Sequence, residues 1–209
     1  DMVSRGLGDV YKRQALVLAD ILAHQSGLAA WIPYYLRTIT TDSARAFWYT
    51  PQNAESIALT TTLYLRGSVK DTMFAMLKKS DLKSKDYRYS DLGYYLFQRM
   101  LERHNNENLD SWAHSTFYLP LGANRLTYNP LEKGYTLDEI PPTEQDQYWR
   151  NTTIHGRVHD MGAAMMGGVA GHAGLFANAN SLAKMMQMYL WEGTYGGIKF
   201  FEPSTIKKF

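Results

Sequence analysis

The sequence predicts a mainly helical domain with few and short strands, and two observations support this. Apolar residues recur every three or four positions, as in amphipathic helices, in residues 15–25, 70–79, 92–104, 110–121 and 178–191. Strand-like runs are confined to residues 59–65 and 198–201. A chain of 209 residues can bury one sizeable core, so a single domain is expected.

Residues 92–104 carry the clearest helix pattern. One apolar face is formed by Leu92, Tyr95, Leu96, Met100 and Leu101. Ser90 or Asp91 is placed to cap the start of this helix, because a side-chain oxygen there can accept a first-turn N–H. Asn105 and Asn106 follow as the expected end.

The outer helices have weaker but similar patterns. The first, over residues 15–25, has Gly27 as its expected stop. The last begins at Asn178 or Asn180 and is expected to point its apolar residues inward, namely Leu182, Met185, Met186 and Tyr189. Between them, residues 161–176 are rich in Gly, Ala and Met, which predicts close backbone packing.

The composition is that of a soluble globular protein, with 45% hydrophobic and 20% charged residues and a formal net charge of +2. This balance gives no reason to expect nucleic acid or a membrane surface as a partner. The chain has no cysteine, which excludes disulfides and thiolate metal sites. No apolar run reaches the roughly 18 residues of a transmembrane helix.

Both ends of the chain look truncated. Residues 1–14 lack apolar periodicity and resemble translated sequencing-adapter read-through, so we leave them out of the fold prediction. Residues 203–209 begin a helix and stop within two turns. We therefore expect residues 15–209 to be the central part of one domain.

Three segments occur in order along the chain: residues 16–28, which end in His-Gln-Ser-Gly-Leu, the tripeptide Tyr89-Ser90-Asp91, and residues 167–176, Gly-Gly-Val-Ala-Gly-His-Ala-Gly-Leu-Phe. Together they resemble motifs of the β-lactamase/penicillin-binding-protein superfamily of serine hydrolases, in its class C-like esterase and D-peptidase branch. The resemblance implies an α/β, β-lactamase/transpeptidase-like fold with an antiparallel sheet flanked by helices. Most strands of that sheet come from the two ends, so this chain should be mainly helical.

The resemblance also implies a mechanism and site residues. A serine, activated by a lysine one helical turn later, would form an acyl-enzyme that water resolves, without a cofactor. Tyr89 matches the tyrosine that shuttles the proton, and Asp91 stands where the family most often has Asn. Trp31, His172 and Gly174 are the residues expected to bind substrate, with Trp31 stacking on an acyl group or a sugar.

The substrate implied is an ester, an amide or a D-amino-acid peptide, with a connection to the cell wall. The pattern of residues 167–176 resembles Bacteroidota-type members, which are often fused behind a β-N-acetylglucosaminidase domain. A periplasmic or otherwise extracytoplasmic location is therefore expected. The sequence does not separate an esterase from a peptidase or a β-lactamase.

The nucleophile of this mechanism has no clear counterpart in the chain. Ser-x-x-Lys occurs at Ser80, Ser181 and Ser204, but none of these is well placed relative to Tyr89. We therefore predict that the chain is inactive by itself and that its serine lies upstream. The alternative is a non-catalytic relative that binds cell-wall fragments, and an upstream segment without Ser-x-x-Lys would favour it.

Histidines offer a second class of function. His155, His159, Asp160 and His172 could supply nitrogen and oxygen ligands to a zinc ion. Gly156 disfavours a helix there, however, and no Glu follows His155 as the metalloprotease pattern requires. We expect instead that His159 and His172 are buried and shape a cleft wall, and that His24 caps a helix end.

Overall fold

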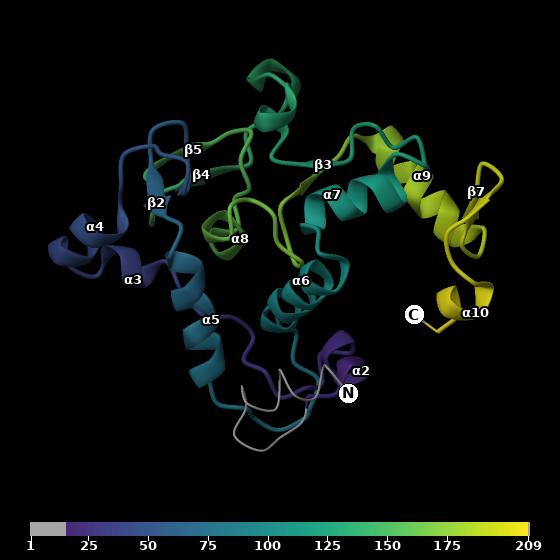
Figure 1. Ribbon diagram of the computed structural model, residues 1–209, viewed down its shortest axis with the longest axis horizontal. Coiled ribbons are helices and arrows are strands. Elements are labelled where there is room, and N and C mark those ends of the chain that lie inside the picture. The colour runs from purple at the N-terminus through teal and green to yellow at the C-terminus, as the bar shows by residue number, and fades with distance from the viewer. Residues whose placement is uncertain (1–15, 209) are drawn as a thin grey trace.

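The computed structural model describes residues 16–208, and most of its regular structure is helical (Figure 1). The α-helices are α2 (Leu18–Leu22), α3 (Leu36–Ile39), α4 (Asp42–Trp48), α5 (Val69–Lys79), α6 (Leu92–Asn105), α7 (Leu109–Ala113), α8 (Met161–Met165), α9 (Ala179–Leu190) and α10 (Pro203–Ile206). Shorter turns are the π-helix η1 (His114–Tyr118) and the 3-10 helices η2 (Pro130–Lys133) and η3 (Leu137–Glu139).

The strands are short and pair in antiparallel twos. Hairpins are formed by β1 (Ser56–Ala58) with β2 (Tyr64–Arg66), β4 (Glu144–Asp146) with β5 (Thr152–Ile154), and β7 (Thr194–Tyr195) with β8 (Ile198–Lys199). The pair β3 (Thr127–Tyr128) and β6 (Leu175–Phe176) is not a hairpin, because it joins segments distant in the sequence. It ties the end of the glycine-rich segment to the middle of the chain.

The mainly helical prediction is confirmed, and so are the positions of α5, α6 and α9. The first helix is shorter than predicted: it ends at Leu22, because His24 already has a left-handed backbone with φ of 56°. The strand predicted over residues 59–65 is also displaced. Residues 59–63 form the turn of the β1–β2 hairpin, in which the Leu59 N–H bonds to the Leu63 carbonyl at 2.8 Å.

Helix α9 buries a different face from the one predicted. Ser181 and Met188 are buried and Met185 packs against the same cluster, so the contact row runs along positions i, i+4 and i+7. Leu182, Met186 and Tyr189, which were expected inward, are 46%, 45% and 42% exposed. The apolar surface of α9 is wider than its contact with the rest of the described chain.

Two buried clusters fill the molecule. The large core lies among α2, α5, α6, α8 and the β1–β2 hairpin, and includes Ile21, Leu28, Leu65, Leu77, Leu92 and Trp149. The small core lies between η1, the segment before β3 and α9, and includes Tyr118, Leu121, Leu126 and Met188. Within residues 16–208, no helix has the length and apolar character needed to span a membrane.

Candidate active site

The tripeptide Tyr89-Ser90-Asp91 lies at the start of α6 and is fixed to the loop that follows α2. The Ser90 hydroxyl donates to the Ala29 carbonyl at 2.6 Å and accepts the Leu92 N–H at 3.2 Å. The Asp91 N–H bonds to the Ala30 carbonyl at 3.0 Å. Ser90 is buried, whereas Tyr89 is 59% exposed, so the backbone is anchored while the phenol faces outward.

His24 belongs to this site, and its predicted role as a helix cap is wrong. Its Nδ1 accepts the Ser90 N–H at 3.1 Å, so that nitrogen carries no proton. The His24 ring lies 4.6 Å from the ring of Tyr89, centroid to centroid. The histidine of the His-Gln-Ser-Gly-Leu segment thus helps to hold the tripeptide in place.

Gly27 allows the loop that follows α2 to approach the backbone of Lys83 closely. Its φ is 79°, and a Cβ there would stand 2.5 Å from the Lys83 carbonyl oxygen. The Lys83 N–H bonds to the Gly27 carbonyl at 2.7 Å. A side chain at this position would break that contact and displace the loop, since both the backbone conformation and the space require glycine.

The phenol of Tyr89 and the carboxylate of Asp91 are coupled. The negative charge of Asp91, then burial and a hydrogen bond to Asp91, raise the pKa of Tyr89. Burial raises the pKa of Asp91, while the His172 ring and the Tyr89 hydrogen bond act in the opposite direction. Among the described residues, the charged groups that act on Tyr89 are acidic, so its hydroxyl keeps its proton at neutral pH.

A second group of side chains lies close to Asp91. His172 Nε2 is 3.0 Å from Asp160 Oδ1 and 3.4 Å from the Tyr95 hydroxyl, and its side chain is 4% exposed. Asp160 also caps α8, because Oδ1 accepts the Ala163 N–H at 2.6 Å. Burial raises the pKa of Asp160, but the bonds from His172 and Ala163 outweigh it and hold the pKa below its usual value.

The His172 loop is packed against α6 through glycine and Gln98. The Gly171 N–H donates to Gln98 Oε1 at 3.2 Å, and Gln98 Nε2 donates to the Val169 carbonyl at 3.0 Å. A Cβ on Gly171 would stand 2.5 Å from the Tyr94 carbonyl oxygen. The small residues of this segment therefore serve close packing, as the sequence predicted, and they bring His172 next to Asp160.

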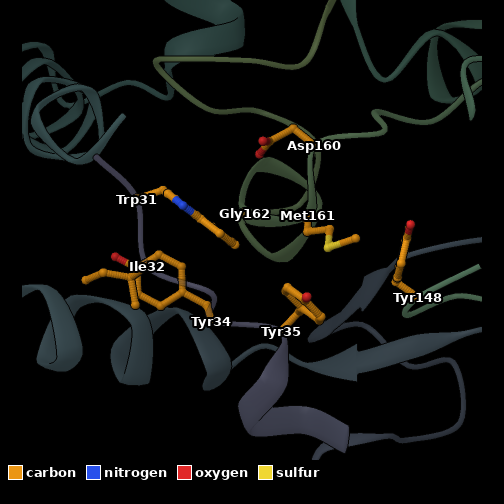
Figure 2. A pocket seen from close by; sticks show the side chains of 8 residues that line it. All are labelled: Trp31, Ile32, Tyr34, Tyr35, Tyr148, Asp160, Met161 and Gly162. Atoms are coloured by element: carbon orange, nitrogen blue, oxygen red, sulfur yellow. The ribbon is translucent and has the colours of Figure 1, made fainter. Parts of the chain in front are cut away.

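A hollow of about 370 Å³ lies beside Asp160. Figure 2 shows Trp31, Tyr35 and Tyr148 around it, with the Asp160 carboxylate on a further side. Trp31 is 59% exposed and Tyr148 is 75% exposed, so these rings are not packed into the core and are open to a ligand. Tyr34, by contrast, is buried and packs edge-on against Tyr95 with ring centroids 5.9 Å apart.

A buried ion pair supports the walls of this hollow. The Arg150 Nε donates to Asp146 Oδ2 at 2.6 Å, and both side chains are fully buried. The Arg150 guanidinium also donates to the carbonyls of Val158 at 2.9 Å and His159 at 2.6 Å, directly before Asp160. We call this set of contacts, together with Trp149, the Arg150 network.

Trp149 extends the Arg150 network to the other wall. Its indole N–H donates to the Thr38 hydroxyl at 3.1 Å and the Tyr49 hydroxyl at 3.0 Å. Its ring lies 5.9 Å from the ring of Tyr35. Tyr148 is its chain neighbour, and the Tyr148 N–H is held by Asp146 Oδ1 at 2.9 Å.

The structure thus brings four of the five predicted site residues into one region: Tyr89, Asp91 and His172 through direct or electrostatic contact, and Trp31 through the hollow beside Asp160. It does not place Gly174 there. Gly174 is buried, and a Cβ on it would stand 2.2 Å from the Gly168 carbonyl oxygen. A substrate-binding role for Gly174 stays a prediction.

The other histidines differ from expectation. His159 is exposed, so its predicted burial is wrong. The ring of His155 bonds to the carbonyls of Leu137, at 3.0 Å, and Ile140, away from the His172–Asp160 pair. Among residues 16–208, no three His, Cys, Asp or Glu side chains gather as metal ligands would.

The three Ser-x-x-Lys matches have structural surroundings of their own. Ser181 is buried and accepts the Arg125 N–H at 3.1 Å, while the Lys184 ammonium donates to the Gly122 carbonyl at 2.6 Å. Ser80 donates to the Leu77 carbonyl at the end of α5 at 2.7 Å. Lys207 pairs with Glu192 at 3.1 Å on the surface.

The Tyr89 motif before α6, the loop around His24 that is bound to it and the glycine-rich His172 segment are the arrangement that the resemblance to the β-lactamase class predicts. Comparison with known families agrees: the family described as Beta-lactamase matches residues 6–199, and the chain belongs to it. The match begins within the first fourteen residues, so their exclusion as an artefact stays a prediction.

Curated relatives cover part of the same region. A Salmonella paratyphi B protein, provisionally named a D-alanyl-D-alanine carboxypeptidase, is 36% identical over 154 residues, covering 67% of this chain and 36% of the relative. A protein of Salmonella newport with the same name gives the same values. The chain therefore spans about a third of the length of these relatives, 36%.

Solved structures share the fold. The octameric penicillin-binding protein homologue of Pyrococcus abyssi aligns with a TM-score of 0.60 and 16% identity, over 95% of this chain and 39% of that one. The D-amino acid amidase of Ochrobactrum anthropi aligns with a TM-score of 0.58 and 10% identity, over 98% and 51% of the two chains. The predicted β-lactamase/transpeptidase-like fold is confirmed.

Proposed function

We propose that the chain forms the helical side of the active site of a serine acyl-transfer hydrolase, in which Tyr89 transfers the proton between nucleophile and leaving group. The observation that carries the proposal is the exposed Tyr89 phenol on a fully anchored backbone, hydrogen-bonded to Asp91. A group that moves a proton must be fixed in position and yet reach the substrate, and Tyr89 meets both conditions.

The charges around Tyr89 explain what else the reaction needs. With Asp91 beside it, the phenol is a weaker acid than free tyrosine, and it releases its proton only if a cation approaches. The lysine of a Ser-x-x-Lys motif would supply that cation and would find in Asp91 an acceptor for its ammonium group. Asp91 then serves as the anchor of the lysine and not as a donor to substrate.

We propose that the nucleophilic serine and its lysine lie outside residues 16–208. This is supported by the structural hydrogen bonds of Ser181 and Lys184 and by the place of Ser80 at the end of α5. A serine that is buried and already accepts a backbone N–H is poorly placed to attack a substrate.

The test uses the product of the complete gene and, in parallel, the chain of 209 residues. Each is treated with p-nitrophenyl acetate, and acylation is followed by intact mass. We expect the complete protein to form an acyl-enzyme and the shorter chain to remain unmodified. Tyr89→Phe should lower kcat/KM of the complete protein about a hundredfold to ten-thousandfold, the range for loss of a general acid–base group.

Tyr87→Phe is the matched control, because Tyr87 is also exposed, at 69% against 59% for Tyr89, and also contacts the His24 ring, with centroids 6.1 Å apart. It should change kcat/KM little. Full activity in Tyr89→Phe, or acylation of the short chain at Ser80, Ser181 or Ser204, would contradict the proposal. A complete protein that binds substrate without ever being acylated would instead be a non-catalytic relative.

For the substrate we propose a D-amino-acid peptide, amide or ester connected with the cell wall, outside the cytoplasm. The names of the carboxypeptidase and amidase relatives support this class. A fusion partner such as a β-N-acetylglucosaminidase domain is part of the same proposal. Fractionation of cells that express the complete gene tests the location, and recovery in the cytoplasm would overturn it.

A further inference from the structure

We propose that the hollow formed by Trp31, Tyr35, Tyr148 and Asp160 is a subsite for a cationic ammonium group of the substrate. The inference rests on the proposed function in that it assigns this hollow to the substrate. It goes further by naming the charge that the substrate carries. The volume of the hollow, about 370 Å³, lies within the range of small-molecule sites.

The shape of the hollow is that of an aromatic cage. Trp31 and Tyr35 come from the segment before α3, Tyr148 comes from the segment after β4, and the three rings stand on different sides of the hollow (Figure 2). The face of an aromatic ring carries negative electrostatic potential and attracts a cation within about 6 Å. Trp31 and Tyr148 keep 59% and 75% of their surface open, so a ligand can reach them.

The charge of the hollow has the matching sign. Among the described residues that line it, Asp160 alone carries a charge. Both hydrogen bonds that Asp160 accepts from the described residues end on Oδ1, which leaves Oδ2 for a ligand. Asp91 lies near enough to act on Asp160 electrostatically and adds to the negative potential, whereas the rings of His172 and His159 act on Asp160 in the opposite direction.

The same features argue against an anionic ligand. A substrate carboxylate is normally held by the fork of an arginine or the ammonium group of a lysine, and neither residue type lines the hollow within the described chain. A carboxylate would meet Asp160 and the negative faces of the rings. The hollow therefore favours a free amino group over a free carboxyl group.

Parts of the backbone around the hollow are held in place before any ligand arrives. The Tyr148 N–H is bound by Asp146, and the Tyr35 ring lies beside the buried Trp149 ring. The carbonyls of Val158 and His159, just before Asp160, are bound by Arg150. A site whose backbone is already ordered loses less free energy on binding.

The experiment measures binding to the 209-residue chain, without turnover. The indole N–H signal of Trp31, assigned by its loss in Trp31→Phe, is followed by NMR during titration. The probes are D-alanine amide, which is a cation, N-acetyl-D-alanine amide, which is neutral, and N-acetyl-D-alanine, which is an anion. We expect the cation to bind about tenfold more tightly than the neutral probe, and the anion more weakly still.

Asp160→Asn isolates the charge. Asn also caps helices and can accept the His172 and Ala163 N–H groups, so the fold should persist, as a thermal melt would verify. In this variant the preference for the cation should fall to within about twofold of parity. Asp138→Asn, an exposed charge removed elsewhere, is the control and should keep the tenfold preference.

Equal binding of the cationic and neutral probes, or a preference that survives Asp160→Asn, would overturn the subsite. These outcomes do not depend on whether the proposed function is correct. If Tyr89→Phe abolishes acylation but no cation preference exists, the ammonium subsite alone fails. If the preference is present while Tyr89 proves dispensable, the proposed proton transfer alone fails.

Discussion

The large core and the small core of this chain are held together by different interactions. The large core contains a buried ion pair and buried hydrogen-bonding side chains, among them Asp146, Arg150, Thr38 and Gln98. The small core is built from apolar and aromatic side chains, with Phe117 stacked on Phe201 at a centroid distance of 5.5 Å. The buried Ser181 on α9 is a polar residue beside it, and its hydroxyl accepts the Arg125 N–H at 3.1 Å.

The difference follows from what each core supports. Every proposed site residue other than Gly174 lies on loops around the large core, and loops have backbone groups that need partners. Buried polar side chains such as Arg150 supply these partners and fix the geometry. Apolar packing at the small core gives stability without specifying the position of any site residue.

Arg150→Met, in the large core, should have the largest effect, because it should change both the stability and the binding preference of the hollow. It leaves the Asp146 carboxylate buried without its cation, and the free energy of unfolding should fall by about 3–5 kcal/mol. The variant should also lose the cation preference of the Trp31 hollow, because Asp160 is no longer positioned. Urea unfolding and the NMR titration measure the two effects.

Lys85→Met is the control, since the Lys85–Asp20 pair is exposed, with its atoms 2.8 Å apart. It should change the free energy of unfolding by about 0–1 kcal/mol.

The Arg150–Asp146 pair should also make stability depend on pH. Burial raises the pKa of Asp146, but its hydrogen bonds outweigh this and hold the pKa below the usual value. Its contribution to stability is therefore present at neutral pH and lost as the pH falls through the acidic range. A wild-type protein insensitive to acid would count against this role.

Met188→Ala tests the small core. Met188 is 1% exposed, and truncation of a buried methionine costs about 2–5 kcal/mol. Unlike Arg150→Met, this change should leave the Trp31 indole signal and the cation preference unaltered, measured well below the melting temperature. If both variants damage the hollow equally, the division of roles between the two cores is wrong.

The same division decides what could be predicted from the sequence. Helix α6 and the position of Tyr89 at its start follow from apolar spacing and from Ser90, which are local patterns. The Arg150 network is not local, because Trp149 bonds to Thr38, which is 111 residues away. No periodicity in the sequence predicts such a contact. The resemblance predicted Trp31 as a substrate contact, but Tyr35, Tyr148 and Asp160, which line the hollow with it, could not be predicted because long-range contacts bring them together.

His24 shows the same limit at shorter range. At the end of a helical pattern, a histidine is most simply explained as a cap on that helix. Its actual partner, the Ser90 N–H, is 66 residues further along the chain. The face of α9 was mispredicted for a related reason, because apolar spacing gives the direction of an apolar face but not how much of it finds a partner.

Asp91→Asn should have the smallest effect on the fold and a specific effect on the reaction. The negative charge of Asp91 is the first cause of the raised pKa of Tyr89, so removing it should lower that pKa. Activity that depends on the Tyr89 phenolate rises with pH, and its rising limb should therefore move to lower pH in Asp91→Asn. The pH profile of kcat/KM in the complete protein measures this shift.

Asp86→Asn removes an exposed charge three residues before Tyr89 and should leave the limb in place. An unchanged limb in Asp91→Asn would contradict the electrostatic effect of Asp91 on Tyr89. A shift to higher pH would mean that loss of the lysine's anchor outweighs removal of the negative charge, because the phenol then loses the cation that favours its ionised form. The direction of the limb thus decides which effect of Asp91 on Tyr89 is larger, its own negative charge or its hold on the lysine.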